Sequence, residues 1–433
     1  MNAFEKRLRA RTAVAVVGVD AGKYHHALVV RARNGDESRP LTFAATREGF
    51  DEALTFIEGQ ARGTEGFMLV GIEFAGSYGF TLAQYLRGRG PRFEVVSVLA
   101  SHTRRWKEVT HRQPLKTDAK DAASICDLAA QGHFVSFPFL APEYCELRHL
   151  LGAREKLSTL RRGVITRLRA LLDVVFPEFP SVFVNPAGPT ARAVLREYPG
   201  PVALLAATRR RLIRLLARES RSHCGASKAE QLLACAQATI ALPSAQGALS
   251  EEIPLLIERL DLYESQLRVV EDKMERVVAT LPSGRALLTV PCVGPVTAAS
   301  FLGSIGDPTA YESGRQVVAL AGLTLVERSS GTIVGRKRIS KRGRPVLRKH
   351  AHMFAVRSVQ RGGIFRADFE ALLARNGNRA IPALTAIARR GLRMLFSVAR
   401  SGREWTSVPP KCPGPSIGDQ PRRQATTGLE SEN

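Results

Sequence analysis

The chain has 433 residues, enough for two or three domains, and 44% of them are hydrophobic, enough for a sizeable core. Lysine and arginine number 63 against 40 acidic residues, so the formal charge is +23 and a polyanion, nucleic acid above all, is the expected partner. Six scattered cysteines without CxxC spacing argue against zinc sites and disulfide frameworks, and no segment is apolar for long enough to cross a membrane. We therefore expect a cytoplasmic protein with no membrane contact.

The first third of the chain alternates short apolar segments with helical patterns. Helices are predicted at 47–59 and 77–90. Three early strands followed by alternating helices and strands indicate one mixed α/β sheet. The predicted strands are residues 12–19, 25–30, 40–46, 68–73 and 93–100.

The middle of the chain is predicted to be helical. Between 140 and 176, leucine or valine recurs every seventh residue, at Leu150, Leu157, Val164 and Leu171. Between 253 and 281 the apolar positions alternate four- and three-residue steps, which predicts a coiled-coil seam. The two stretches are either the helices of one antiparallel hairpin or part of an oligomer interface. The segment 177–245 reads as a proline-rich piece and arginine-rich helices, with no function assigned. The seam residues of the second stretch are Leu256, Leu260, Tyr263, Leu267, Val270, Met274, Val277 and Leu281.

The last compact part is predicted over 283–402. Its PCVGP sequence at 291–295 precedes a helix of small residues and fits a helix-hairpin-helix. Backbone N–H groups at such a helix start can bind a nucleic-acid phosphate, although the same sequence also fits a plain tight turn. The end of the chain is rich in proline, glycine and serine and is predicted to be a disordered tail.

Four acids form the first candidate site. Asp20 and Glu73 end two predicted strands, and Asp118 and Asp121 lie three residues apart on one face of a predicted helix. Four carboxylates repel one another unless a cation joins them, and Mg²⁺ prefers such oxygens. Two such ions can activate a phosphodiester displacement. Taken singly, Asp20 also fits a turn, Asp118 a helix N-cap and Asp121 a first-turn acid.

A serine pair followed by basic residues forms the second candidate site. Ser329 and Ser330 precede Gly331, and a serine hydroxyl can attack a phosphodiester when nearby cations stabilise the developing charge. The alternative is that both serines are turn residues beside a non-specific phosphate-binding run. The predicted nucleic-acid contacts are Arg336, Lys337, Arg338, Lys341, Arg342, Arg344, Arg348 and Lys349.

The two sites, in this order, resemble those of the DEDD-type insertion-sequence transposases, the family numbered one hundred and ten among insertion sequences. That family includes relatives of the pilin-gene invertases and the bridge-RNA-guided recombinases. VVGVDAGK, VGIEFAGSYGF and LKTDAKDAASICDLA match its acidic motifs, and PCVGPVTAASFLGSIGD with RSSGTIVGRKRISKRGRPVLRK matches its C-terminal part. The resemblance covers about residues 12–135 and 283–360.

The resemblance implies a fold of an α/β part followed by all-α parts. Residues 1–135 would form a RuvC-like, ribonuclease-H-type domain with a mixed sheet, and 136–282 coiled-coil helices with an insertion. Residues 283–402 would form a helical transposase domain with a helix-hairpin-helix, before a disordered tail at 403–433.

The resemblance also implies a mechanism and partners. Asp20, Glu73, Asp118 and Asp121 would hold Mg²⁺, with Mn²⁺ able to substitute. Ser330 would attack a DNA phosphate, form a transient phosphoserine link and permit strand exchange. An element-encoded guide RNA, a dimer or tetramer in which different subunits complete one site, and a place on the prokaryotic nucleoid are the further expectations.

Two positions depart from the family pattern. Ala75 stands where a threonine is usual after the second acid, and Val346 where an aromatic or polar residue often precedes Leu-Arg. Neither departure removes a catalytic acid or the serine.

Two other functions fit the residues. A metal-dependent nuclease or Holliday-junction resolvase would use the acids alone and would form no covalent adduct with DNA. A non-catalytic nucleic-acid-binding protein would use only the basic run and the helices, so Asp118→Ala would change nothing. The sequence does not reveal the DNA target or the RNA.

Overall fold

The computed structural model describes residues 1–61, 64–73, 78–110, 117–137, 139–242, 247–327 and 338–406. The chain divides into two compact units, Met1–Phe139 and Leu140–Asn433. The predicted boundary at 135/136 lies close to this division, whereas the one at 282/283 falls inside the second unit. The further division of that unit into domains stays a prediction.

The first unit is a mixed six-stranded sheet with the strand order β3-β2-β1-β4-β5-β6. β1 pairs antiparallel with β2 and parallel with β4, and β4 pairs parallel with β5. The elements are α1 (Ala3–Thr12), β1 (Ala15–Ala21), β2 (His25–Ala32), β3 (Leu41–Ala44), α2 (Arg47–Gln60), β4 (Met68–Glu73), α3 (Tyr78–Arg87), β5 (Phe93–Val98), α4 (Ala100–Thr110), α5 (Asp118–Ala130) and β6 (Val135–Ser136).

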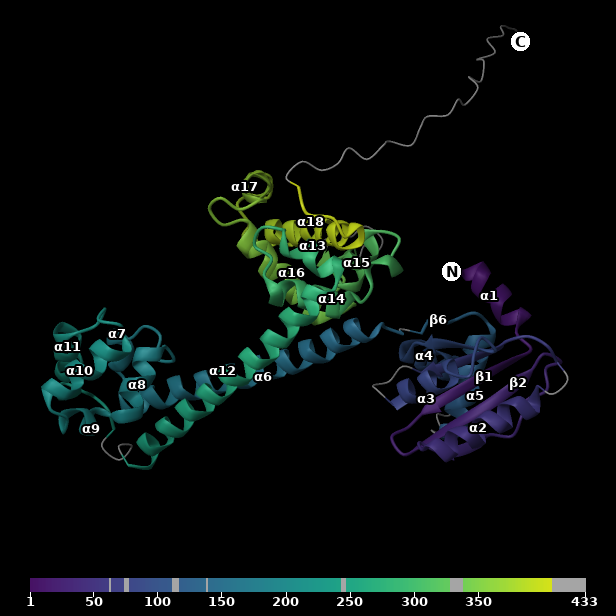
Figure 1. Cartoon of the computed structure of the whole chain (residues 1–433), viewed down its shortest axis with the longest axis horizontal. Coiled ribbons are helices and arrows are strands. Elements are labelled where there is room, and N and C mark those ends of the chain that lie inside the picture. Colours follow the sequence, from purple (N-terminus) through teal and green to yellow (C-terminus); the bar gives the residue numbers. More distant parts are fainter. Residues whose placement is uncertain are drawn as a thin grey trace, which may run out of the picture. The chain divides into compact units, whose positions relative to one another are not determined.

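Alternation along the strands divides the unit into three layers (Figure 1). Val17 and Val19 point to one face, where α2 and α3 pack on the sheet. Val16 and Leu69 point to the other face, where α5 covers the central strands. The predicted mixed sheet is therefore confirmed, with all five predicted strands present. α1 and α4 were not predicted.

The second unit consists almost entirely of helices. Among its described residues, as in the first unit, no helix is long and apolar enough to span a membrane. The elements are α6 (Pro142–Val175), α7 (Phe179–Val182), α8 (Pro189–Glu197), α9 (Pro201–Leu205), α10 (Arg209–Glu219), α11 (Ala226–Gln237), α12 (Ala248–Thr280), α13 (Pro282–Leu288), α14 (Pro295–Ile305), η2 (Pro308–Ala310), α15 (Gly314–Leu320), β7 (Leu325–Val326), β8 (Arg338–Ile339), α16 (Pro345–Ser358), α17 (Arg366–Arg375) and α18 (Ala380–Ser401).

The two long helices α6 and α12 pack along each other as an antiparallel pair (Figure 1). The start of α6 shares a core with the end of α12, and the end of α6 shares a second core with the start of α12. Three ion pairs join the two helices along their length: Arg154–Glu271, Arg161–Glu264 and Arg167–Glu252. The predicted seam of α12 thus has its partner within the chain, because all its residues are buried or half-buried along the pair.

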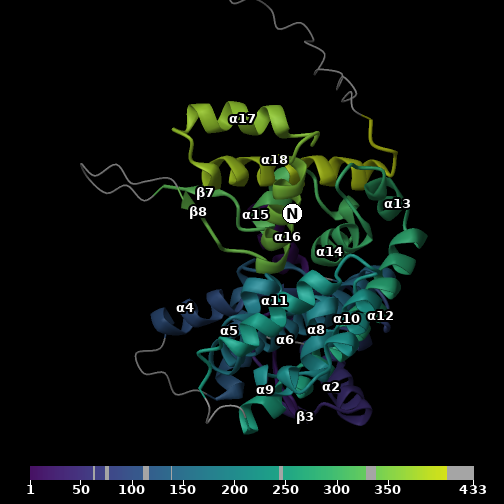
Figure 2. The same ribbon diagram turned by 90° about the vertical axis from the view of Figure 1, so that its left-hand side faces the viewer.

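Helices α13–α18 form a bundle around the end of this pair that holds Met274 and Val278. Every residue of α14 from Thr297 to Ile305 is buried in it. Figure 2 shows α17 lying alongside α18 and the short β7–β8 hairpin beneath them. Trp405 packs on the bundle, and its backbone N–H donates to Thr289 Oγ1 at 2.8 Å. The predicted tail is therefore ordered at its start, while residues from 407 on lie outside the described residues.

Candidate active site

The first two candidate acids end neighbouring parallel strands. β1 and β4 pair in register up to Val19 and Ile72, which directly precede Asp20 and Glu73. Side chains alternate along a strand, so Asp20 points to the same face as Val16, and Glu73 to the same face as Leu69. That face carries α5. The strand ends therefore direct both acids toward the helix that bears the other two.

A glycine permits the close approach of α5. A Cβ atom at Gly18 would lie 2.2 Å from the carbonyl oxygen of Ala122 and 2.3 Å from the backbone nitrogen of Cys126. Only glycine leaves room for the helix backbone at this distance from β1. Gly18 stands two residues before Asp20, so the contact that fixes the helix lies directly beside the acid.

The start of α5 sets the positions of Asp118 and Asp121. Thr117 is the N-cap and accepts a hydrogen bond from the Lys120 backbone N–H at 3.4 Å. Asp118 is the first helical residue, so the interpretation of this acid as an N-cap was wrong. Asp121 lies in the first turn and is only 8% exposed.

The four acids interact electrostatically. The pKa of Asp20 rises to about 6 because of burial and because the carboxylates of Asp121, Asp118 and Glu73 repel its ionised form. Lys107 of α4 lowers this pKa in part. Its ammonium group forms an ion pair with Asp121. The structure thus brings the four predicted acids near one another and adds a lysine that the sequence did not indicate.

The chemistry of these donors suits a divalent cation, since carboxylate oxygens are the ligands that Mg²⁺ prefers and their mutual repulsion is relieved by positive charge. Among the described residues, however, no three His, Cys, Asp or Glu side chains are grouped closely enough to hold a metal ion. Lys107 supplies the cation beside Asp121 instead. The lysine contacts Oδ1 of Asp121, so a metal ion would bind the other carboxylate oxygen or displace the lysine.

The second candidate site falls partly outside the described residues, because Ser329, Ser330, Arg336 and Lys337 lie within 328–337. The strands on either side are described. β7 and β8 pair antiparallel, with Leu325 opposite Ile339 and Val326 opposite Arg338.

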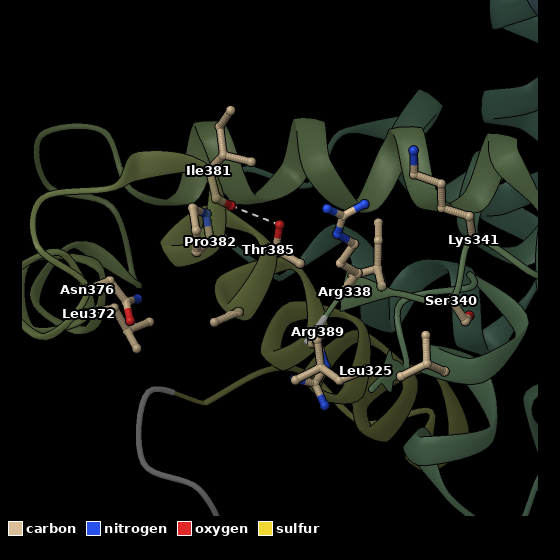
Figure 3. A pocket seen from close by; sticks show the side chains of 13 residues that line it. Leu325, Arg338, Ser340, Lys341, Leu372, Asn376, Ile381, Pro382, Thr385 and Arg389 are labelled. Atoms are coloured by element: carbon tan, nitrogen blue, oxygen red, sulfur yellow. Dashed lines mark hydrogen bonds between the residues drawn. The ribbon is translucent and has the colours of Figure 1, made fainter. Parts of the chain in front are cut away.

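A cavity of about 1080 Å³ lies beside this hairpin (Figure 3). Arg338, Lys341 and Arg389 supply its positive charge, and Arg389 Nε is buried without a hydrogen-bond partner among the described residues. Leu325 and Ile381 contribute apolar surface. Positive charge of this kind favours an anionic ligand such as a phosphate group.

The described basic residues of the second site divide into two groups. Arg338, Lys341 and Arg342 are exposed, and their side chains have no hydrogen-bond or ion-pair partner among the described residues. Three others make internal contacts. Arg344 Nη1 donates to the Ser304 carbonyl, Arg348 Nη1 donates to the Ala321 carbonyl at 2.9 Å, and Lys349 Nζ pairs with Glu155 at 2.6 Å. A nucleic-acid role for all six stays a prediction, and the three unpaired residues can contact DNA without breaking an internal bond.

Two family models match this chain, both described as transposases. One, for the DEDD transposases of IS110 type, matches residues 17–177 and thus spans β1, β4 and α5 with all four acids. The other, for transposases of the IS116/IS110/IS902 family, matches residues 284–370. The chain belongs to the IS110-type family of insertion-sequence transposases. Members of such families are enzymes that cleave and rejoin DNA.

Relatives of this transposase extend the match to nearly its whole length. It is 28% identical over 397 residues to the uncharacterized 44.8 kDa protein of insertion element IS116 from Streptomyces clavuligerus, covering 91% of this chain and 96% of that protein. It is 28% identical over 302 residues to the 43.6 kDa protein of IS110 from Streptomyces coelicolor, covering 68% and 73%. A probable family 20 transposase of Pseudomonas aeruginosa is 26% identical over 235 residues, covering 54% and 56%.

Proposed function

We propose that this transposase cleaves and rejoins DNA strands with a divalent-metal carboxylate site and a serine nucleophile, Ser330. The observation that supports the metal site is the electrostatic coupling of four carboxylates at the ends of two parallel strands and the start of α5. Four acids in this position cost folding free energy unless a cation joins them. The proposed ligands are Asp20, Glu73, Asp118 and Asp121, with Mg²⁺ as the ion and Mn²⁺ able to substitute.

The proposed chemistry is a pair of transesterifications. The bound metal ion would stabilise the negative charge that develops on the phosphodiester oxygens. Ser330 Oγ would form a bond to phosphorus, the bond from phosphorus to one strand oxygen would break, and the serine proton would leave with the freed strand hydroxyl. Attack by the hydroxyl of another strand end would reverse these steps and restore the serine. No net oxidation or nucleotide hydrolysis is needed.

The remaining partners follow from the resemblance in the sequence. We propose that an element-encoded RNA chooses the DNA target by base pairing, so that the protein binds backbone and shape. We also propose that a dimer or tetramer forms the working enzyme, with acids and serine from different subunits. The exposed residues Arg338, Lys341 and Arg342 would contact the phosphate backbone.

A nuclease that uses the acids alone is the second candidate. The carboxylate cluster favours it to the same degree, because the cluster by itself is enough for metal-assisted hydrolysis. In that case the attacking group is water and Ser330 has no chemical role. A covalent bond between protein and DNA separates the two functions.

The metal site is tested by Mg²⁺-dependent cleavage of DNA from the flanks of the gene, with the matching RNA present. Asp20→Asn and Asp118→Asn should each lower the rate at least a hundredfold, and substituting Mn²⁺ for Mg²⁺ should retain cleavage by the unaltered protein. Asp127→Asn is the matched control, because Asp127 lies on the same helix but pairs with Arg31 instead of the cluster. Equal rates for the Asp118 and Asp127 variants would exclude the proposed ligand set.

A further inference from the structure

The helices between α6 and α12 form a small domain at the end of the long helix pair. This tip domain, residues 176–242, packs α7–α11 against the last turns of α6 and the first turns of α12 in one apolar core. Arg192 of α8 is 9% exposed and pairs with Asp261 at 2.6 Å and Glu264 at 2.9 Å, both on α12. The domain is therefore fixed to the helix pair by burial and by ion pairs.

The tip domain carries more positive charge than it can neutralise. It contains nine arginine and lysine residues, four glutamates and no aspartate. Each glutamate has a partner inside the domain. Glu178 accepts from Thr239 Oγ1 at 2.7 Å, and the other three form ion pairs, Glu197 with Arg211, Glu219 with Arg218 and Glu230 with Arg209.

The surplus charge gathers on the outer side of α10. Leu212, Leu215 and Leu216 turn one side of this helix into the core. Arg210 and Arg214 lie one turn apart on the exposed side, and Arg221 follows the end of the helix. None of these three arginines has an anionic partner within the described residues.

The sequence of α10 opposes the usual charge preference of a helix. Its first turn holds three consecutive arginines, Arg209–Arg211, and no acid, and Thr208 makes no side-chain cap hydrogen bond. Positive charge at this end is unfavourable because the helix dipole is positive there. A bound polyanion would reduce both the unfavourable interaction with the helix dipole and the repulsion between the arginines.

We propose that this outer side of α10, with Arg210, Arg214 and Arg221, binds the phosphate backbone of duplex DNA. DNA is favoured because the chain belongs to a transposase family, whose substrate is DNA. Arg210 and Arg214 lie about 6 Å apart along the helix axis, which allows contact with successive phosphates of one strand. Contacts of this kind position the protein without reading sequence.

The tip domain and the α13–α18 bundle lie at opposite ends of the long helix pair. α6 has 34 residues and is therefore about 50 Å long, more than one turn of duplex, which is about 34 Å. α10 lies at the end of the helix pair away from the α13–α18 bundle (Figure 1). A single duplex that contacts both α10 and the bundle would therefore have to run along the helix pair.

The test is a salt titration of DNA binding by the full chain. The double variant Arg210→Gln/Arg214→Gln removes two unpaired charges, and the matched control Arg209→Gln/Arg218→Gln removes two charges of the same helix that are already paired. Glutamine is a good helix former, so both variants should fold. The probe is a duplex of about 60 base pairs, and no metal ion is added, so the DNA is not cleaved during the titration. The result therefore does not depend on whether the proposed cleavage chemistry is correct.

The first variant should weaken binding by about tenfold or more at moderate salt and lower the slope of log affinity against log salt by roughly 1.8, as expected for two lost phosphate contacts. The control should change affinity less than about threefold. Arg221→Gln should lower the slope by roughly 0.9. An equal loss in both double variants would show a diffuse effect of net charge and overturn the proposal. A loss confined to duplex RNA in a parallel titration would overturn it in favour of an RNA-binding surface.

Discussion

The ammonium group of Lys107 pairs with the carboxylate of Asp121 and so joins α4 to the start of α5. The pair places one positive charge beside the acid cluster, in which burial and the repulsion of the other three carboxylates raise the pKa of Asp20 to about 6. We expect a divalent cation bound by the cluster to compete with this lysine for Asp121. We therefore expect the position and contacts of the Lys107 side chain to differ most between the metal-free and metal-bound forms.

Lys107→Gln should destabilise the metal-free protein by about 1–3 kcal/mol, because Asp121 is 8% exposed and would lose its cation. Saturating Mg²⁺ should restore most of this loss, since the ion takes the place of the ammonium group. Urea unfolding with and without Mg²⁺ measures both. Lys120→Gln, an exposed change on α5 beside Asp121, is the control and should have little effect. The same destabilisation at every Mg²⁺ concentration would show that Lys107 does not occupy the metal position.

The pH dependence of stability should reveal the raised pKa of Asp20. A carboxyl whose folded pKa is about 6 against an ordinary 3.8 binds its proton more tightly in the folded state. Its contribution to stability is thus fully present below pH 3.8 and is lost as the pH rises through 6. Asp20→Asn should be more stable than the unaltered, metal-free protein above pH 6, with the difference vanishing toward pH 4. Melting temperatures of both proteins across this range, in chelator, test the prediction; a difference independent of pH contradicts it.

The sequence predicted the strands that carry Asp20 and Glu73, because short apolar runs ending in an acid are a local signal. It also predicted the helix of Asp118 and Asp121, on which the two acids are three residues apart and share one face. It did not predict α4, whose sequence ASHTRRWKEVT has a single buried residue, Thr103, and so no apolar stripe. Lys107 was missed with it. The glycine two residues before each strand-end acid, Gly18 and Gly71, was a usable signal for a helix packed close to these strands.

Gly18→Ala tests the close contact between β1 and α5. The added Cβ atom would collide with helix backbone at Ala122 and Cys126, so the helix must move away from the strand. We expect a loss of about 1–3 kcal/mol or more, and a fall in DNA cleavage beyond that explained by unfolding, because Asp118 and Asp121 move with the helix. Gly152→Ala on α6 has no atom within 4 Å of its added Cβ and should stabilise by about 0.5–1 kcal/mol. Full cleavage by folded Gly18→Ala protein would contradict the account.

We expect some basic residues after the start of β8 to contribute to DNA binding and others to stability. Lys349→Gln should lower stability by about 0.2–1 kcal/mol, because it removes an ion pair with Glu155 that is weakened by partial exposure, and should change DNA affinity little. Arg342→Gln should leave the melting temperature unchanged and weaken DNA binding severalfold, with a salt slope lower by roughly 0.9. Thermal unfolding and a DNA-binding titration of the two variants provide the comparison. Equal effects on binding would refute the division.

The basic run shows what a sequence pattern leaves undecided. Charge density along 336–349 indicated a phosphate-binding segment, but which arginines face inward depends on carbonyl groups far along the chain, such as Ser304 and Ala321. The helix pair was predictable because its heptads are local. For the tip domain the sequence predicted helices but not how they pack. The ion pairs of Arg192 with Asp261 and Glu264 join residues about seventy positions apart, and no local pattern indicates them.

The central claim is that metal-site carboxylates and Ser330 act in one recombination reaction. Its most direct test is a denaturing gel for protein–DNA adducts after incubation with Mg²⁺, flanking DNA and the matching RNA. The account predicts an adduct with the unaltered protein and with Ser329→Ala, and none with Ser330→Ala or Asp118→Ala. DNA cleavage without any adduct, unaffected by either serine change, would contradict the serine mechanism and identify the protein as a metal-dependent nuclease.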